Sequence, residues 1–408
     1  MMPVPPKSYL FPLTERVGDL STAVELKFLA PLIPLRVKAP GLVDAQTRSP
    51  ALGVFFDEQQ LQRQTYATIA DTIRTVAWQR SISSFDIQQK KLHEKDFWKS
   101  HWVVKKANSA EPARDDARYC GYIWVPVEVS SPKLSWRDPK VLPRVEAVLS
   151  ALRSRHRIVS NYSCEVHVHI GRNDDTLFSL RTMKRFATLA WLAEPILRAV
   201  KDPKSPNFQH FYTWSSALRE RSRLALTIKR YENIQCLCSG SVEEFNLFLA
   251  QVGRCAEASP QAEALRAIWC AASHVELGKM LSGPEKQYRR LGFNFSALGE
   301  EDERANTGPK TIEVRFLEGI VRESAVLGWL RICCRLMEIS GCEESTETAF
   351  RHAVRRLLKD GGAAPIDQTF AQLMEDIGID SPVYTPFQNL IRRNYGLSER
   401  SNENSLWE

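Results

Sequence analysis

Four segments of the chain alternate apolar side chains with charged or imidazole side chains, and this alternation most constrains the fold. The segments are AVELKF (23–28), WVPVEV (124–129), VHVHI (166–170) and TIEVRF (311–316). Successive side chains of a β-strand point to opposite faces of the sheet. Each segment therefore predicts a strand with one apolar face and one polar face, and we expect these faces to be shared in a single sheet.

The polar positions of these segments hold residue types that bind hard cations and phosphate. They are Glu25, Lys27, Glu128, His167, His169, Glu313 and Arg315. Each segment taken alone is compatible with an ordinary half-exposed antiparallel strand. If the four strands are neighbours, however, their carboxylates would repel one another unless cations were bound. Taken together, the segments favour a cation and phosphate site on the shared polar face.

Composition excludes several other classes of protein. The chain has 408 residues with 55 basic and 48 acidic side chains, and this mild, dispersed excess argues against nucleic-acid binding. Nine cysteines without a C-x-x-C pair predict reduced thiols and a cytoplasmic location. The most apolar long stretch, 186–200, is interrupted by Glu194 and Pro195, so no membrane span is expected.

The sequence lacks the motifs of several other catalytic classes. The chain has no P-loop, no G-x-G-x-x-G and no G-x-S-x-G. The H-x-H pair of His167 and His169 leaves a metal-dependent amidase open, although such a site needs further ligands. None of the six remaining histidines lies in a recognisable motif.

The chain resembles the amidoligases common in fungi, which belong to the carboxylate–amine ligase group related to glutamine synthetase and glutamate–cysteine ligase. The resemblance runs from about residue 20 to 325. It is carried by these segments, in order along the chain: VELKF (24–28), HWVVKKANS (101–109), VEVSSP (127–132), SCEVHVHIG (163–171), YRRLGFNFSAL (288–298) and TIEVRFLEG (311–319).

The resemblance implies an ATP-dependent ligase that joins a small carboxylate and an amine through an acyl phosphate. The implied fold is α+β, with a curved antiparallel sheet of the glutamine-synthetase type, flanking helices and a helical C-terminal region. Mg²⁺ is the implied metal, and the histidine among its ligands is compatible with Mn²⁺. The implied ligands are Glu25, Glu128, His167 and Glu313. His169 and Arg315 would be catalytic, and the nucleotide would contact Lys27, Asn294 and Arg315. Glu318 lies past the expected strand and is a weaker candidate.

Three positions depart from the pattern of the family. Lys27 stands where a second acidic residue is usual, Glu165 replaces a glycine, and Ala107 stands where aspartate is typical. These departures keep three hypotheses open, which are an altered number of metal ions, an unusual substrate, and a catalytically impaired binding protein on the same fold. The predicted organisation is a flexible tail at 1–18, a catalytic domain at 19–340 with a helical insertion at about 178–282, and a helical extension at 341–408.

Overall fold

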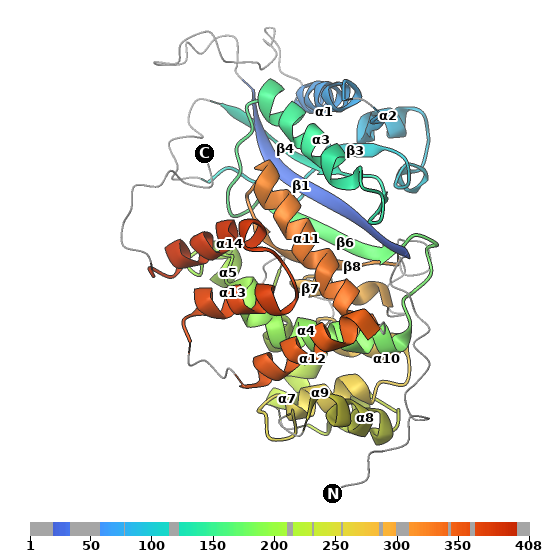
Figure 1. Cartoon of the computed structure of the whole chain (residues 1–408). Coiled ribbons are helices and arrows are strands. Elements are labelled where there is room, and N and C mark those ends of the chain that lie inside the picture. Colours follow the sequence, from blue (N-terminus) through green and yellow to red (C-terminus); the bar gives the residue numbers. More distant parts are fainter. Residues whose placement is uncertain are drawn as a thin grey trace, which may run out of the picture.

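The computed structural model describes eleven stretches of the chain. They are residues 19–32, 58–76, 78–113, 122–209, 215–230, 232–253, 256–284, 289–298, 310–341, 344–359 and 364–397. The predicted tail at 1–18 lies outside these residues. The described residues form a mixed α+β protein with one open, mostly antiparallel sheet and many helices (Figure 1). The predicted α+β class is therefore confirmed.

The sheet contains all four alternating segments. Its strands are β1 (Leu20–Leu32), β2 (Ser81–Ser83), β3 (Trp102–Lys106), β4 (Ile123–Ser130), β5 (Leu134–Ser135), β6 (Glu165–Arg172), β7 (Phe293–Asn294) and β8 (Ile312–Glu318). The strand order is β2-β3-β4-β1-β6-β8-β7, and β5 pairs with β1. Among the strands that the structure describes, β2 and β3 are the only pair that is parallel. Sequence reasoning did not predict β2 and β5, which are too short for their alternation to be recognised.

The apolar face of the sheet packs against three helices, α1 (Glu58–Arg74), α3 (Val141–Arg155) and α11 (Glu323–Ser340) (Figure 1). The side chains predicted to face this way are at most 2% exposed. They are Val24, Leu26, Phe28, Val125, Val127, Val129, Val166, Val168, Ile170, Ile312, Val314 and Phe316. Burial of apolar surface stabilises a fold by about 25 cal/mol for each Å². In the four alternating segments the sequence pattern therefore sets which face is turned away from these helices.

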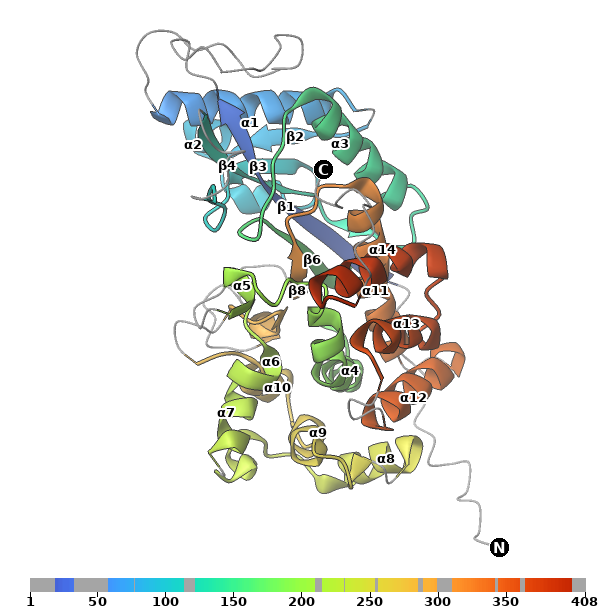
Figure 2. The same ribbon diagram turned by 90° about the vertical axis from the view of Figure 1, so that its left-hand side faces the viewer.

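The remaining helices lie beyond the β6–β8 side of the sheet (Figure 2). Helix α2 (Ser84–Gln89) is the exception, because it lies beside β2 and β3. The others are α4 (Leu180–Arg198), α5 (Pro206–Gln209), α6 (Leu218–Arg221), α7 (Arg223–Lys229), α8 (Val242–Val252), α9 (Ala262–Trp269), α10 (His274–Leu281), α12 (Glu344–Lys359), α13 (Ile366–Asp376) and α14 (Ser381–Asn394). The buried helix α4 contacts α9, α11, α12 and α13 and so connects the helical layers. No helix among the described residues is long and apolar enough to cross a membrane.

A β-bulge changes which side chains of β8 reach the polar face. Val168 pairs with Val314, but Val166 pairs with Leu317, so β8 has one extra residue between these two pairs. An extra residue reverses the in–out alternation beyond it. Glu318 consequently pairs with Glu165 and is only 3% exposed. The expectation that Glu318 lies past the strand is wrong, because β8 continues through the bulge to this residue.

Candidate active site

The strand register brings the predicted polar side chains together on one face. Glu25 of β1 is directly opposite His167 of β6, and Lys27 of β1 is directly opposite Glu128 of β4. On the other side of β6, His169 pairs with Glu313 of β8. The central position of β1 and β6 thus collects side chains from four strands that are far apart in the sequence.

Three of these side chains form a compact cluster of potential metal ligands. Glu25, His167 and Glu313 each offer one ligand atom, and these atoms all lie within 4.8 Å of one another. His167 Nδ1 is 3.1 Å from Glu25 Oε2 and 2.8 Å from Glu313 Oε1. Two carboxylates and one imidazole suit a divalent cation such as Mg²⁺ or Mn²⁺. The donor set therefore fits the metal that the sequence implied, and Glu25, His167 and Glu313 are the residues that would hold it.

His169 lies beside this cluster and is more accessible than His167. Its Nε2 is 3.2 Å from Glu25 Oε1 and 3.7 Å from Glu313 Oε1, and its Nδ1 is 3.2 Å from Thr311 Oγ1. The His169 side chain is 20% exposed, whereas that of His167 is 1% exposed. Of the two histidines, only His169 can meet a molecule that arrives from solvent.

Arg315 and Asn294 both bind the second oxygen of Glu313. Arg315 Nη2 donates to Glu313 Oε2 at 2.6 Å, and Asn294 Nδ2 donates to the same oxygen at 3.0 Å. Asn294 is placed by the pairing of the two-residue strand β7 with β8. These contacts fix the orientation of Glu313 and leave its Oε1 facing His167 and His169.

Glu128 lies outside the three-residue cluster and is matched by lysines. Lys105 of β3 is 3.3 Å from Glu128 Oε1 and also donates to Glu94 at 2.7 Å. Lys27, directly opposite Glu128, has its Nζ 3.2 Å from His167 Nε2. Sequence reasoning missed Lys105 because the segment WVVKK (102–106) alternates only weakly.

A second polar group, around Glu165, contacts the Nε2 side of the His167 ring. The sequence analysis named Glu165 only as the replacement of a glycine and assigned it no role in the site. Glu165 precedes His167 by two residues on β6, is 1% exposed, and has its Oε2 2.9 Å from His167 Nε2. The other oxygen of Glu165 is 3.2 Å from Lys201 Nζ, and Lys201 is also 3.4 Å from Glu318 Oε1. The alternation of β6 could have indicated Glu165. Nothing in the pattern indicated Lys201, which follows α4 in an irregular segment.

Ala107, where the resemblance predicts aspartate, directly follows β3 and has an apolar environment. It is 1% exposed and packs in a small apolar cluster with Leu29, Ala110 and Cys164. The loss of a carboxylate at this position is therefore matched by apolar surroundings.

The electrostatics of the site follow from close pairing in a buried setting. Burial alone would raise the pKa of Glu25 and Glu313, but the histidines, with Arg315 beside Glu313, hold both pKa values well below the ordinary range. Burial, Lys27 and Arg315 lower the pKa of His167, yet the neighbouring carboxylates outweigh them and raise it to about 9. Burial and the Glu25 carboxylate raise the pKa of Glu128. The two carboxylates of the cluster are therefore ionised at neutral pH.

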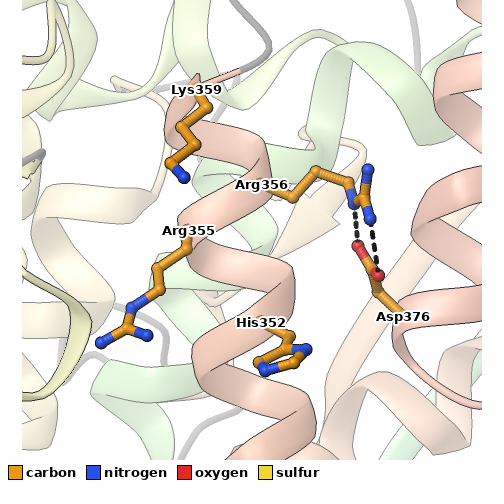
Figure 3. Close-up of a pocket in the computed structure, with 5 residues that line it drawn as sticks. All are labelled: His352, Arg355, Arg356, Lys359 and Asp376. Carbon is orange, nitrogen blue, oxygen red and sulfur yellow. Dashed lines mark hydrogen bonds and ion pairs between the residues drawn. The ribbon is translucent and has the colours of Figure 1, made fainter.

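A pocket lies away from the sheet, on α12 and α13 (Figure 3). His352, Arg355, Arg356 and Lys359 line it together with Asp376. Arg356 binds both carboxylate oxygens of Asp376, and Arg355 donates to carbonyl oxygens at the end of α8. These arginines connect α12 to α13 and α8. Their contacts account for the residues of the pocket as groups that hold the helices together.

The fold and the site together define a class of α+β protein whose open, mostly antiparallel sheet carries clustered carboxylate, imidazole and guanidinium groups on one face. Residues 44–337 match the model of a family described as "putative amidoligase enzyme", and the chain belongs to this family. Glu25 and Lys27 precede the matched residues, whereas Glu128, His167, Asn294 and Glu313 lie within them. No curated protein matches the chain.

Proposed function

We propose that the protein is an ATP-dependent ligase that forms an amide bond between a small carboxylate and an amine. In this reaction ATP phosphorylates the carboxylate, the amine attacks the acyl phosphate, and amide, ADP and phosphate are released. Membership of the amidoligase family supports a ligase. We further propose that the open sheet is of the type found in glutamine synthetase and related carboxylate–amine ligases.

The observation that carries the proposal is the convergence of Glu25, His167 and Glu313, with Arg315 bound to the same Glu313. Phosphoryl transfer requires positive charge against the phosphate oxygens. A divalent cation bound at the three-residue cluster would supply part of this charge. Arg315 is the protein's own contribution, and its guanidinium is held 2.6 Å from Glu313 Oε2 before any substrate arrives.

The remaining polar side chains have roles that follow from their exposure. His169 is the accessible imidazole next to the cluster and would contact the carboxylate or amine substrate. Lys27 and Asn294 are the other groups that we assign to nucleotide or substrate. Glu128 is paired with Lys105. We therefore propose that Glu128 balances the charge of the lysines on this face rather than binding the cation held by Glu25, His167 and Glu313.

The test is release of ADP by purified protein with Mg²⁺ and a panel of amino acids, other carboxylic acids, and amines including polyamines. Glu313→Gln and His167→Ala should each abolish the release that depends on acid and amine. Glu263→Gln on α9 is the matched control, because Glu263 is exposed and far from the sheet in sequence and fold.

Two results would contradict the proposal. Unchanged turnover in Glu313→Gln would show that the cluster is not the site. Amide hydrolysis without nucleotide, together with stoichiometric Zn²⁺ in the purified protein, would identify a metal-dependent amidase instead.

A further inference from the structure

The buried carboxylate of Glu165 has no place in the function proposed so far, and its surroundings hold it in one orientation. Its Oε1 accepts hydrogen bonds from Ser215 Oγ at 2.8 Å and Asn207 Nδ2 at 2.8 Å, and Lys201 Nζ lies 3.2 Å away. Three donors on one oxygen leave Oε2 to face His167 Nε2 at 2.9 Å. Because these groups are at most 8% exposed, water does not compete for the same positions.

This orientation decides which nitrogen of His167 keeps its hydrogen when a cation is bound. An ionised carboxylate can only accept hydrogen bonds, so Nε2 must donate to Glu165. Lys27 Nζ is also near Nε2, at 3.2 Å, and the opposite assignment would have Nε2 accept from this lysine. That assignment would set the Nε2 lone pair against the Glu165 oxygen at 2.9 Å. Glu313 Oε1 and Glu25 Oε2 lie 2.8 Å and 3.1 Å from Nδ1, so in the metal-free chain Nδ1 donates as well, and its hydrogen is the one that a bound cation would replace. Lys27 can turn its ammonium group on a flexible chain, whereas Glu165 is fixed by three donors.

We propose that Glu165 is a positioning residue that keeps a hydrogen on Nε2 of His167, so that Nδ1 is the nitrogen that gives its lone pair to a divalent cation. The inference rests on the cation site of the proposed function, and it adds the group that prepares the site. A carboxylate or carbonyl behind a metal-binding histidine commonly fixes its tautomer and raises its basicity. Here Lys201, Ser215 and Asn207 extend this support into the segment that follows α4.

The informative variant is Glu165→Gln, which keeps the size of the side chain. Three donors surround the position of Oε1, so the amide oxygen would be drawn to that position. The amide NH₂ would then point at His167 Nε2 and donate to it, and the neutral imidazole would carry its hydrogen on Nδ1. This tautomer turns an N–H rather than a lone pair toward Glu25 and Glu313. We expect Mn²⁺ to bind about 10–100-fold more weakly, the range typical for loss of such a supporting group.

Glu318→Gln is the matched control. Glu318 is also buried and also lies near Lys201 at 3.4 Å, and the substitution likewise replaces a carboxyl group by an amide. It pairs with Glu165 across the strands, and no contact joins it to His167 in the part of the chain that the structure describes. Mn²⁺ affinity should therefore change by less than about threefold in this variant.

The measurement is a titration of the full chain with Mn²⁺ alone, followed by electron paramagnetic resonance of the free ion, with folding checked by circular dichroism. Ser215→Ala, which removes one donor from Glu165, is a milder second variant and should weaken Mn²⁺ binding by a smaller factor. Nitrogen-15 spectra of histidine-labelled protein report the tautomer directly, at a Mg²⁺ concentration that saturates the native chain and leaves the weaker site of Glu165→Gln empty. His167→Ala identifies the signal, which should show hydrogen on Nε2 in the native chain and on Nδ1 in Glu165→Gln.

Several outcomes would overturn the inference. They are native Mn²⁺ affinity in Glu165→Gln, an equal loss in Glu318→Gln, an unchanged tautomer, and absence of Mn²⁺ binding by the native chain. No nucleotide or turnover enters these measurements. Weakened Mn²⁺ binding in Glu165→Gln, together with no ADP release by the native chain, would support the positioning role and contradict the ligase. The opposite pair of results would contradict the positioning role alone.

Discussion

Gly292 lies where the backbone before β7 approaches the ring of Phe316, and its replacement by alanine tests how tightly this end of the sheet is packed. A Cβ at position 292 would lie 2.0 Å from Phe316 Cε1 and 2.5 Å from Cζ. Ordinary carbon contacts are about 3.5–4.0 Å, so the ring would have to move by more than 1 Å. Phe316 is 0% exposed, and its ring packs edge-on against Phe293 with centroids 5.0 Å apart.

The cost of Gly292→Ala can be bounded from this contact. Overpacking of a well-filled core costs about 1–3 kcal/mol. Complete expulsion of the ring would approach the cost of a Phe→Ala change, about 3–5 kcal/mol. We therefore expect a loss of about 2–4 kcal/mol in the free energy of unfolding. Because the Arg315 N–H donates to Gly292 O at 2.8 Å, displacement here should also disturb the position of Arg315.

A double-mutant cycle with Phe316→Leu isolates the clash. Leucine lacks the two ring atoms nearest to the new Cβ, so Gly292→Ala should cost at least about 1 kcal/mol less in the Phe316→Leu background. Urea unfolding of the four proteins, followed by tryptophan fluorescence and circular dichroism, measures this difference. Equal costs of Gly292→Ala in the two backgrounds would refute the packing argument.

Three further predictions concern charge. Burial, opposed by two backbone N–H donors from Leu218 and Arg219, raises the pKa of Glu194 from 4.5 to about 7. The folded state then holds this proton between pH 4.5 and pH 7, so stability is lost as pH rises through that window, by roughly 3 kcal/mol at most. Thermal melts should show that Glu194→Gln removes this dependence, and parallel pH profiles would argue against it. Arg315→Met should lower kcat by about 10²–10³-fold without weakening Mn²⁺ binding, whereas weakened binding would indicate a structural role. Lys27→Met removes an ammonium near the cluster, and Mn²⁺ titration should show roughly tenfold tighter binding. Unchanged affinity would mean that Lys27 does not oppose the cation.

The alternation of the sequence predicted the shared polar face because side-chain direction in a strand depends only on position along it. This rule located Glu25, His167 and Glu313 without knowledge of the strand order. It failed at Glu318, because a bulge in β8 is set by how two strands pair and leaves no local signature in the sequence. It also could not locate Lys201, whose position depends on how the segment after α4 packs beneath β6.

The expectation that clustered carboxylates would repel one another without bound cations also needs revision. Glu313 is paired with Arg315, Glu128 with Lys105, and Glu165 with Lys201. Most of the negative charge is thus neutralised by the chain's own cations, so the face can fold without metal. The carboxylate of Glu25 has no lysine or arginine among its hydrogen-bond partners in the described residues and faces His167 and His169 instead.

This difference gives the polar face two parts with different tasks. The lysine-matched carboxylates are fixed by buried ion pairs, and breaking one of these would leave an uncompensated buried charge. Glu25 and the Oε1 atom of Glu313 face the imidazoles of His167 and His169, which can exchange a hydrogen for a metal ion. A divalent cation can therefore enter between Glu25, His167 and Glu313 without separating any lysine or arginine from its partner. By the same reasoning, Glu165 belongs with the carboxylates that are fixed by lysines. His167 contacts both parts of the face, so the orientation of its imidazole ring links the buried ion pair of Glu165 to the cation site.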